Sequence, residues 1–120
     1  LANDDKWQVR AAVAENINST TRLLKHLSKD KSGAVRIITA ENKNTKSKVL
    51  ESLSIDSNKD VRNSVATNSN TSMEILDALS KDIDAEVRFA VAINKNTSLE
   101  TLKFLLNDED DDVFEAANNN

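Results

Sequence analysis

The chain has 120 residues, which is enough for one domain with a buried core. Apolar residues make up 38% of it and charged residues 30%, a balance that fits an elongated array with two wetted faces better than a compact globule. It has no cysteine and a single histidine, His26, which excludes disulfides, Cys-based zinc sites, thiol chemistry and clustered histidine ligands. No apolar run approaches the ~20 residues of a membrane span, so we expect no membrane partner and a cytoplasmic location.

One pattern with a period of 26 residues runs through the chain without an insertion or deletion. An aspartate opens each unit, at Asp4, Asp30, Asp56, Asp82 and Asp108. A valine recurs at Val9, Val35, Val61, Val87 and Val113, and an asparagine at Asn16, Asn42, Asn68, Asn94 and Asn120. A leucine recurs at Leu1, Leu27, Leu53, Leu79 and Leu105. The repeat predicts a single domain over 1–120, with units 4–29, 30–55, 56–81 and 82–107 and a partial unit 108–120.

The first half of each unit is predicted to be a short helix, as in the segment 84–94. Its start is expected near Asp5, Ser32, Ser57 and Asp84, which are all competent N-cap residues. Its end is expected at the repeated asparagine, because asparagine is, after glycine, the residue best suited to the left-handed turn that ends a helix.

The second half is predicted to be another short helix, as in the segment 97–108. Thr71 with Glu74, and Thr97 with Glu100, match the capping box at its start. Leu99, Leu102 and Leu105 follow at intervals that place them on one helix face. Helices this short do not persist alone in water, so stacked valine and leucine layers must supply the stability.

The run from Asp82 to Leu105 resembles the repeat unit of the leucine-rich repeat variant family, and the likeness extends over the whole chain at the same period. The resemblance implies an all-α, right-handed α-solenoid of about four and a half two-helix units, with one helix of each unit of the tighter 3₁₀ type. Ser72 and Ser98 stand where the family usually has proline. No cofactor is expected, because the cysteines that hold an iron–sulfur cluster in one family member are missing here. A more distant likeness to HEAT-type repeats implies the same architecture.

One arginine per unit, starting with Arg10, is the most conspicuous polar feature. It could form a basic ladder for phosphates or acidic peptides. The favoured interpretation is structural: each arginine pairs with the aspartate six residues earlier or with its copy in the next unit, which pins the loops. This structural ladder comprises Asp30, Arg36, Asp56, Arg62, Asp82 and Arg88. For the asparagines, which could instead bind peptide backbones, bonding within the turns is favoured.

Catalysis has little support in the sequence, and we expect no enzyme. His26 has no neighbouring nucleophile motif, and no glycine-rich phosphate loop is present. The acids of segment 108–112 lack the alternation and glycine of a calcium loop. They fit better as charge at the N-terminus of the last helix.

The outward positions of the second helix vary between units and form the candidate partner-binding face. Its residues are Arg22, Lys25, His26, Lys29, Lys48, Glu51, Ile55, Glu74, Asp77, Lys81, Lys103 and Phe104. Ile55 and Phe104 are candidate anchors, although packing over the next layer explains them slightly better. Trp7 and Phe89 are aromatic at positions of the first helix that are otherwise small or polar.

Charge is divided unevenly along the chain. Residues 1–55 hold ten Lys and Arg against six acids, a net of +4, and residues 56–120 hold six against fourteen, a net of −8. This polarity allows head-to-tail self-association. The predicted function is a non-catalytic protein- or peptide-binding scaffold. A nucleic-acid module in the basic half is a disfavoured alternative, given the pI near 5.0, and a structural spacer from a longer array is another.

Overall fold

A computed structural model describes residues 6–120, which form nine α-helices and no strand. The helices alternate between two lengths along the chain. The five longer ones, called A helices below, are α1 (Trp7–Glu15), α3 (Gly33–Glu41), α5 (Lys59–Thr67), α7 (Ala85–Ile93) and α9 (Asp111–Asn119). The four shorter ones, called B helices, are α2 (Thr21–Leu27), α4 (Ser47–Leu53), α6 (Met73–Leu79) and α8 (Leu99–Leu105).

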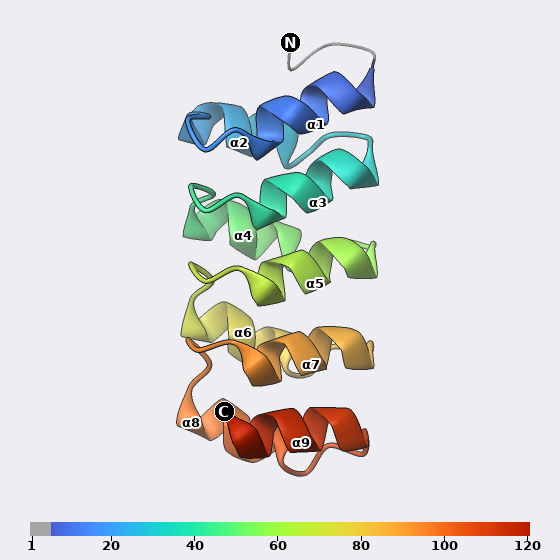
Figure 1. Ribbon diagram of the computed structural model, residues 1–120, viewed down its shortest axis with the longest axis vertical. Coiled ribbons are helices and arrows are strands. Elements are labelled where there is room, and N and C mark those ends of the chain that lie inside the picture. Colours follow the sequence, from blue (N-terminus) through green and yellow to red (C-terminus); the bar gives the residue numbers. More distant parts are fainter. Residues whose placement is uncertain (1–5) are drawn as a thin grey trace.

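The helices stack into a column that measures 45 × 20 × 18 Å (Figure 1). Each A helix packs directly on the A helix of the next repeat, and the A helices form one continuous layer. Each B helix packs against the A helices on either side of it in the chain. Consecutive B helices are not among the closely packed pairs in residues 6–120, so the B layer is more open. The all-α solenoid expected from the repeat is confirmed. No helix of the described part has the length and apolarity needed to cross a bilayer.

Both helices of each repeat are α-helical, which corrects the expectation that one of them is of the 3₁₀ type. In α2, the amides of Leu24 and Ser28 donate to the carbonyls four residues earlier, at 3.0 and 2.9 Å. The tighter 3₁₀ spacing is confined to the end of the helix, where Asp30 N–H donates to Leu27 O at 3.1 Å. One turn at the C-terminus is therefore tightened, rather than the whole B helix.

The B helices begin one residue later than the capping-box pattern predicts. Ser72 and Ser98 are the N-caps, and their hydroxyls accept from the amides of Ile75 and Thr101. Thr71 is buried instead, and its Oγ1 donates to Val65 O at 2.6 Å, which fastens the B helix to the end of the preceding A helix. The capping-box assignment was wrong because two adjacent hydroxyl residues compete for the two roles.

The A helices begin close to the predicted residues. Ser32 and Asp84 are N-caps as expected, whereas Asn58 takes the place predicted for Ser57. Asn58 and Asp84 cap through their side chains, and Ser32 does not. The prediction for Asp5 lies outside the described residues.

The repeated asparagines end the A helices as predicted, but in an extended conformation. Asn42, Asn68 and Asn94 have φ between −68° and −71° and ψ between 126° and 130°. No residue from 6 to 120 has positive φ, so the expected left-handed turn is wrong. A side-chain bond replaces it: Asn42 Oδ1 accepts from Asn44 N–H at 2.8 Å and closes an Asx turn.

The core forms two clusters of buried residues, a small one with Ala11, Ala14, Leu27 and Val35 and a large one that extends from Ala40 to Ala117. Its fully buried side chains are Leu24, Leu27, Leu50, Leu53, Leu76, Leu105, Val35, Val61, Val65, Val87, Val91 and Val113. Leu1 is outside the described part. Leu99, which was expected on the buried face of its helix with Leu102 and Leu105, is 69% exposed. It is the first residue of α8, where Thr101 and Leu105 are buried and Leu102 is partly buried against the core.

Candidate functional site

Each repeated arginine connects three successive segments of the column. Arg36 Nε and Nη2 donate to the two carboxylate oxygens of Asp56, at 2.8 and 3.3 Å, one repeat ahead. Its Nη1 donates to the backbone oxygen of Asp30 at 2.8 Å. The same geometry recurs at Arg62 and Arg88. Of the two expected pairings, the carboxylate one is with the next unit, and the aspartate six residues earlier accepts through its backbone.

The repeated aspartates serve two purposes at once. The Oδ1 atom of Asp108 accepts from Arg88 Nη2 and also from the backbone N–H of Asp110, at 3.2 and 2.9 Å. Burial by itself would raise the pKa of Asp108, but the bonds from Arg88 and from Asp110 N–H outweigh it and lower the pKa below its ordinary value. The pKa of Asp30 is lowered in the same way, by Arg10 and the Ser32 amide against burial. These carboxylates therefore accept hydrogen bonds from within the chain and are not free to bind a ligand.

The repeated asparagines form a second connection between repeats. Asn68 Nδ2 donates to Ala40 O at 2.8 Å and to Asn42 O at 3.2 Å, both in the preceding repeat. Asn42, Asn94 and Asn120 make the corresponding bonds. The amides of Asn44, Asn70 and Asn96 donate to the preceding turn as well. Because these amide groups are engaged by backbone carbonyls of the column, they are part of its frame.

The face predicted to bind a partner lies on the outside of the B helices. All twelve of its side chains are exposed: Arg22, Lys25, His26, Lys29, Lys48, Glu51, Ile55, Glu74, Asp77, Lys81, Lys103 and Phe104. Within residues 6–120, two contacts join successive repeats at this face: Lys81 Nζ lies 5.6 Å from the centre of the Phe104 ring, and Thr101 Oγ1 donates to Asp77 Oδ1 at 3.0 Å. The side chain of Ile55 is 84% exposed. The structure thus places these residues on one side of the column but spreads them over separate helices.

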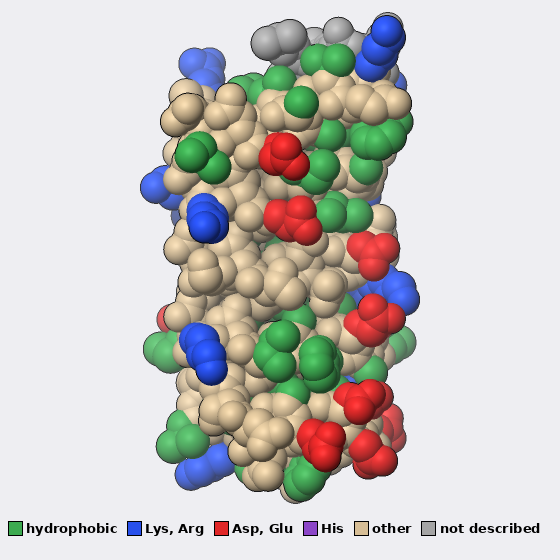
Figure 2. All heavy atoms as spheres, in the orientation of Figure 1, with side chains coloured by type: hydrophobic (Ala, Val, Ile, Leu, Met, Phe, Trp, Pro, Cys, Tyr) green, Lys and Arg blue, Asp and Glu red, His purple; other side chains and the backbone are tan. Residues whose placement is uncertain are grey.

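The outer side of the A helices is a second exposed face, and it is continuous because the A helices touch. Figure 2 shows acidic side chains along this face, most densely toward the C-terminal end, with hydrophobic side chains between them. Asp60, Glu86 and Asp112 occupy the same position in three successive repeats and are all exposed. Phe89 stands out in the sequence as an aromatic residue at this face, whereas the repetition of these acids was not predicted as a feature of it, although their 26-residue spacing is visible in the sequence.

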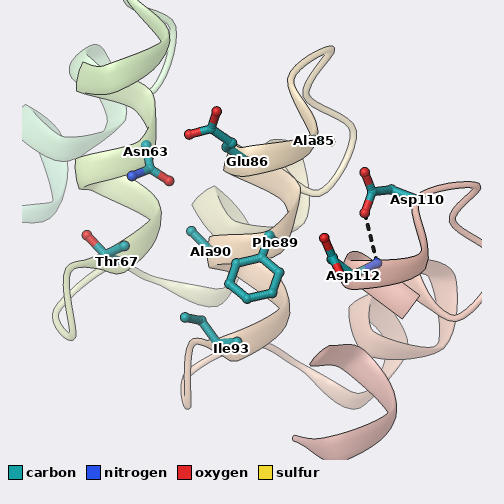
Figure 3. Close-up of a pocket in the computed structure, with 9 residues that line it drawn as sticks. All are labelled: Asn63, Thr67, Ala85, Glu86, Phe89, Ala90, Ile93, Asp110 and Asp112. Carbon is teal, nitrogen blue, oxygen red and sulfur yellow. Dashed lines mark hydrogen bonds between the residues drawn. The ribbon is translucent and has the colours of Figure 1, made fainter. Parts of the chain in front are cut away.

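An open hollow of about 540 Å³ lies on this face between α5, α7 and α9. Phe89 and Ile93 project into it from α7, with Asn63 and Thr67 on the α5 side and acidic residues on the α9 side (Figure 3). Phe89 is 39% and Ile93 49% exposed, although both are large apolar side chains. A second hollow, of about 350 Å³, shares Phe89 and Ile93 and is bordered by Glu115 and Lys95. The two residues therefore form an apolar ridge with space on both sides.

One lysine on this face is held by carboxylates of the next repeat. Lys59 Nζ lies 3.7 Å from Asp84 Oδ2 and 3.5 Å from Glu86 Oε1. The charges of Glu86 and then Asp84 raise the pKa of Lys59 above its ordinary value. Asp84 and Glu86 thus form an acid pair that one lysine of the preceding repeat accompanies.

No group of three His, Cys, Asp or Glu side chains that could hold a metal ion exists in the described part. The acids of segment 108–112 start the last helix, where Asp110 Oδ1 accepts from Asp112 N–H at 2.9 Å and Val113 N–H at 3.2 Å. The exposed surface of the described residues includes the shallow A-helix face and B-helix face of the helical column.

Among solved structures, the chain is similar to one described as a leucine-rich repeat variant with a novel repetitive protein structural motif. The two superpose with a TM-score of 0.80 over 98% of this chain, at 28% sequence identity. This chain has a leucine-rich repeat variant fold. It spans 46% of the length of that protein. No family model and no curated protein matches the sequence.

The leucine-rich repeat variant fold explains why the conspicuous ladders of the sequence are internal. The arginine and asparagine series recur because every interface between repeats uses the same bonds. Many positions that differ from repeat to repeat are exposed. At the site of Phe89, which is 39% exposed, the other repeats carry Ala11, Ile37, Asn63 and Glu115, and of these Ala11 is buried.

Proposed function

We propose that this chain is a non-catalytic scaffold that binds a protein or peptide on the outside of its helical column. The observation that supports it is the division of positions in the repeat. The repeated valines, leucines, arginines and asparagines are buried or bonded within the frame, whereas most charged and aromatic residues that differ between repeats are exposed. A few varying positions, such as that of Val49, Ile75 and Thr101, are buried. In repeat proteins the variable positions on a constant frame are where recognition takes place. We place this function in the cytoplasm, as expected for a chain without cysteines.

Two faces are available to a partner. The A-helix face is continuous and contains the ridge of Phe89 and Ile93, so it offers apolar contact area. The B-helix face offers mainly charged side chains on separated helices, with Phe104 as its aromatic residue. Aromatic side chains such as Phe89 contribute much of the binding energy at protein interfaces. We therefore favour the A-helix face for the main contact and keep the B-helix face as the alternative.

Affinity capture from a lysate of the source cells tests the proposal, with three baits and with or without nuclease. The baits are the wild-type chain, a Phe89→Ser/Ile93→Ser variant of the A-helix face, and a variant of the B-helix face in which Lys48, Glu51, Asp77 and Phe104 are replaced by alanine. We expect a protein that survives nuclease and is lost with one variant only. Capture that depends on nucleic acid would support the alternative function of the basic half, and no capture by any bait would support a spacer.

A further inference from the structure

The hollow beside Phe89 and Ile93 combines apolar contact area with an acidic border. Its border holds Glu86, Asp110 and Asp112, and no basic residue lines it. The adjoining hollow adds Glu115 and a single base, Lys95. An acidic occupant is therefore disfavoured, because like charges brought together at an interface are strongly unfavourable, and a basic occupant is complementary to the border.

The preceding repeat contains an example of a cation beside an equivalent pair of acids. Lys59, the first residue of α5, lies within 4 Å of Asp84 and Glu86, at 3.7 and 3.5 Å. One repeat further on, the residue at the position of Lys59 is Ala85. The acids at the positions of Asp84 and Glu86 are Asp110 and Asp112.

The acid pair at α9 is thus present without the lysine that accompanies its counterpart. No Lys or Arg of residues 6–120 forms an ion pair with Asp110 or Asp112. The nearby arginine, Arg88, already donates to Asp108 and to the backbone oxygens of Asp82 and Ile83. Ala85 itself lines the hollow, so the space that a lysine would take is open to a ligand.

We infer that this groove on α5, α7 and α9 binds a basic segment of another protein, with a Lys or Arg over Asp110 and Asp112 and an apolar side chain against Phe89 and Ile93. The inference rests on the proposed scaffold function and specifies its partner. The chain's own lysine at the equivalent acid pair gives the position of the cation. The exposed ring of Phe89 adds a favourable surface for that cation.

The test begins with selection of a random 12-residue peptide library, displayed on phage, against the complete 120-residue chain. We expect selected peptides to be enriched in Lys or Arg near an aromatic or aliphatic residue. A fluorescein-labelled synthetic copy of the most enriched peptide is then titrated by fluorescence anisotropy. Peptides enriched in acids, or without a charge preference, overturn the inference.

The deciding variant is Ala85→Lys, which repeats the Lys59 arrangement and supplies the missing cation internally. We expect it to weaken peptide binding about fivefold, the effect of one exposed ion pair, and to reduce the salt dependence of the affinity. Ala78→Lys makes the same change on the exposed side of α6 and should leave the affinity unchanged. Equal affinities of wild type and Ala85→Lys overturn the inference.

Two further variants separate the parts of the groove. Phe89→Ser should weaken binding about tenfold, as expected for an aromatic anchor. Asp110→Asn/Asp112→Asn should weaken it without affecting the cap, because asparagine also caps helices. Circular dichroism checks that each variant stays folded.

The remaining outcomes distinguish this inference from the proposed function. Peptides that bind but respond only to Phe104→Ser overturn the groove and leave the scaffold function standing. A library without any binder on either face counts against both. Sedimentation velocity covers a second copy as the occupant: a wild-type dimer that dissociates in the Ala85→Lys variant would overturn the assignment to another protein.

Discussion

Arg62 reaches forward across the boundary between repeats and binds Asp82 with two of its nitrogens, Nε to Oδ2 at 2.8 Å and Nη2 to Oδ1 at 3.2 Å. Both side chains are largely buried, with 14% and 8% of their surface exposed. A bidentate pair of this kind fixes the distance and the rotation between two repeats, because the planar guanidinium permits one orientation. The same bond at Arg36 and Arg88 makes successive interfaces alike.

Replacing Arg62 by alanine should lower the free energy of unfolding by about 3 kcal/mol, because the charge of Asp82 stays buried without its partner. Urea unfolding followed by circular dichroism measures the change. Lys48→Ala is the control and should change the midpoint little, because Lys48 is exposed and forms no ion pair within residues 6–120. Equal effects of the two variants would contradict a structural role of the pair.

Replacing Asn68 by alanine should cost about 2 kcal/mol, because Ala40 O loses this buried donor and Asn42 O keeps only its bond from Thr45 N–H. The matched control is Asn18→Ala. Asn18 is exposed and its side chain makes no bond within residues 6–120, so the expected change is within about 0.5 kcal/mol. Urea unfolding measures both changes, and the midpoints of the two variants are compared after checking that the slope of the unfolding free energy with urea concentration is the same.

Leu76→Ala and Leu99→Ala make the same chemical change at two depths. Leu76 is fully buried between the layers and should lose about 2–5 kcal/mol of stability. Leu99 is 69% exposed and should lose much less. Thermal unfolding of both variants tests the distinction, and a large loss at Leu99 would show that it belongs to the core.

Stability should also depend on pH through Asp108. Its pKa is lower in the folded chain than the ordinary value of 3.8, so the folded state binds fewer protons than the unfolded state in that range. The carboxylate therefore stabilises the fold above about pH 4, and this contribution is lost as the pH falls through the folded pKa. Asp108→Asn should be less stable than wild type at neutral pH. Urea midpoints at a series of pH values should show the difference shrinking below about pH 4.

The 26-residue period alone predicts the solenoid, because positions that repeat without exception are those that pack against a neighbouring copy. The errors occur where a choice depends on the neighbour. Thr71 and Ser72 are both competent caps by their chemistry, and only the contact of Thr71 with Val65 O separates them. Likewise, the extended conformation of Asn42 is stabilised by a bond to Ala14, 28 residues earlier, which local residue preferences do not reveal.

The candidate site was less predictable for the same reason. Phe89 stands out in the sequence as an aromatic at a variable position. That it shares a hollow with Asp112 follows only once α7 and α9 are side by side. The meaning of Ala85 needs one more fact from the structure, the position of Lys59 over the acids of the next repeat. The sequence therefore contained the residues of the groove, and the stacking brought them together.

The bonds that join the repeats reach no further than one unit: Arg62 extends to Asp82, and Asn68 extends back to Ala40. Each repeat therefore joins its neighbours through the same arginine–aspartate and asparagine–carbonyl bonds, whatever its outer residues are. Whole units of 26 residues can be exchanged, duplicated or inserted, provided that the repeated aspartate, arginine and asparagine of each unit are kept. Evolution by unequal recombination can then change recognition one unit at a time, and a protein engineer can do the same.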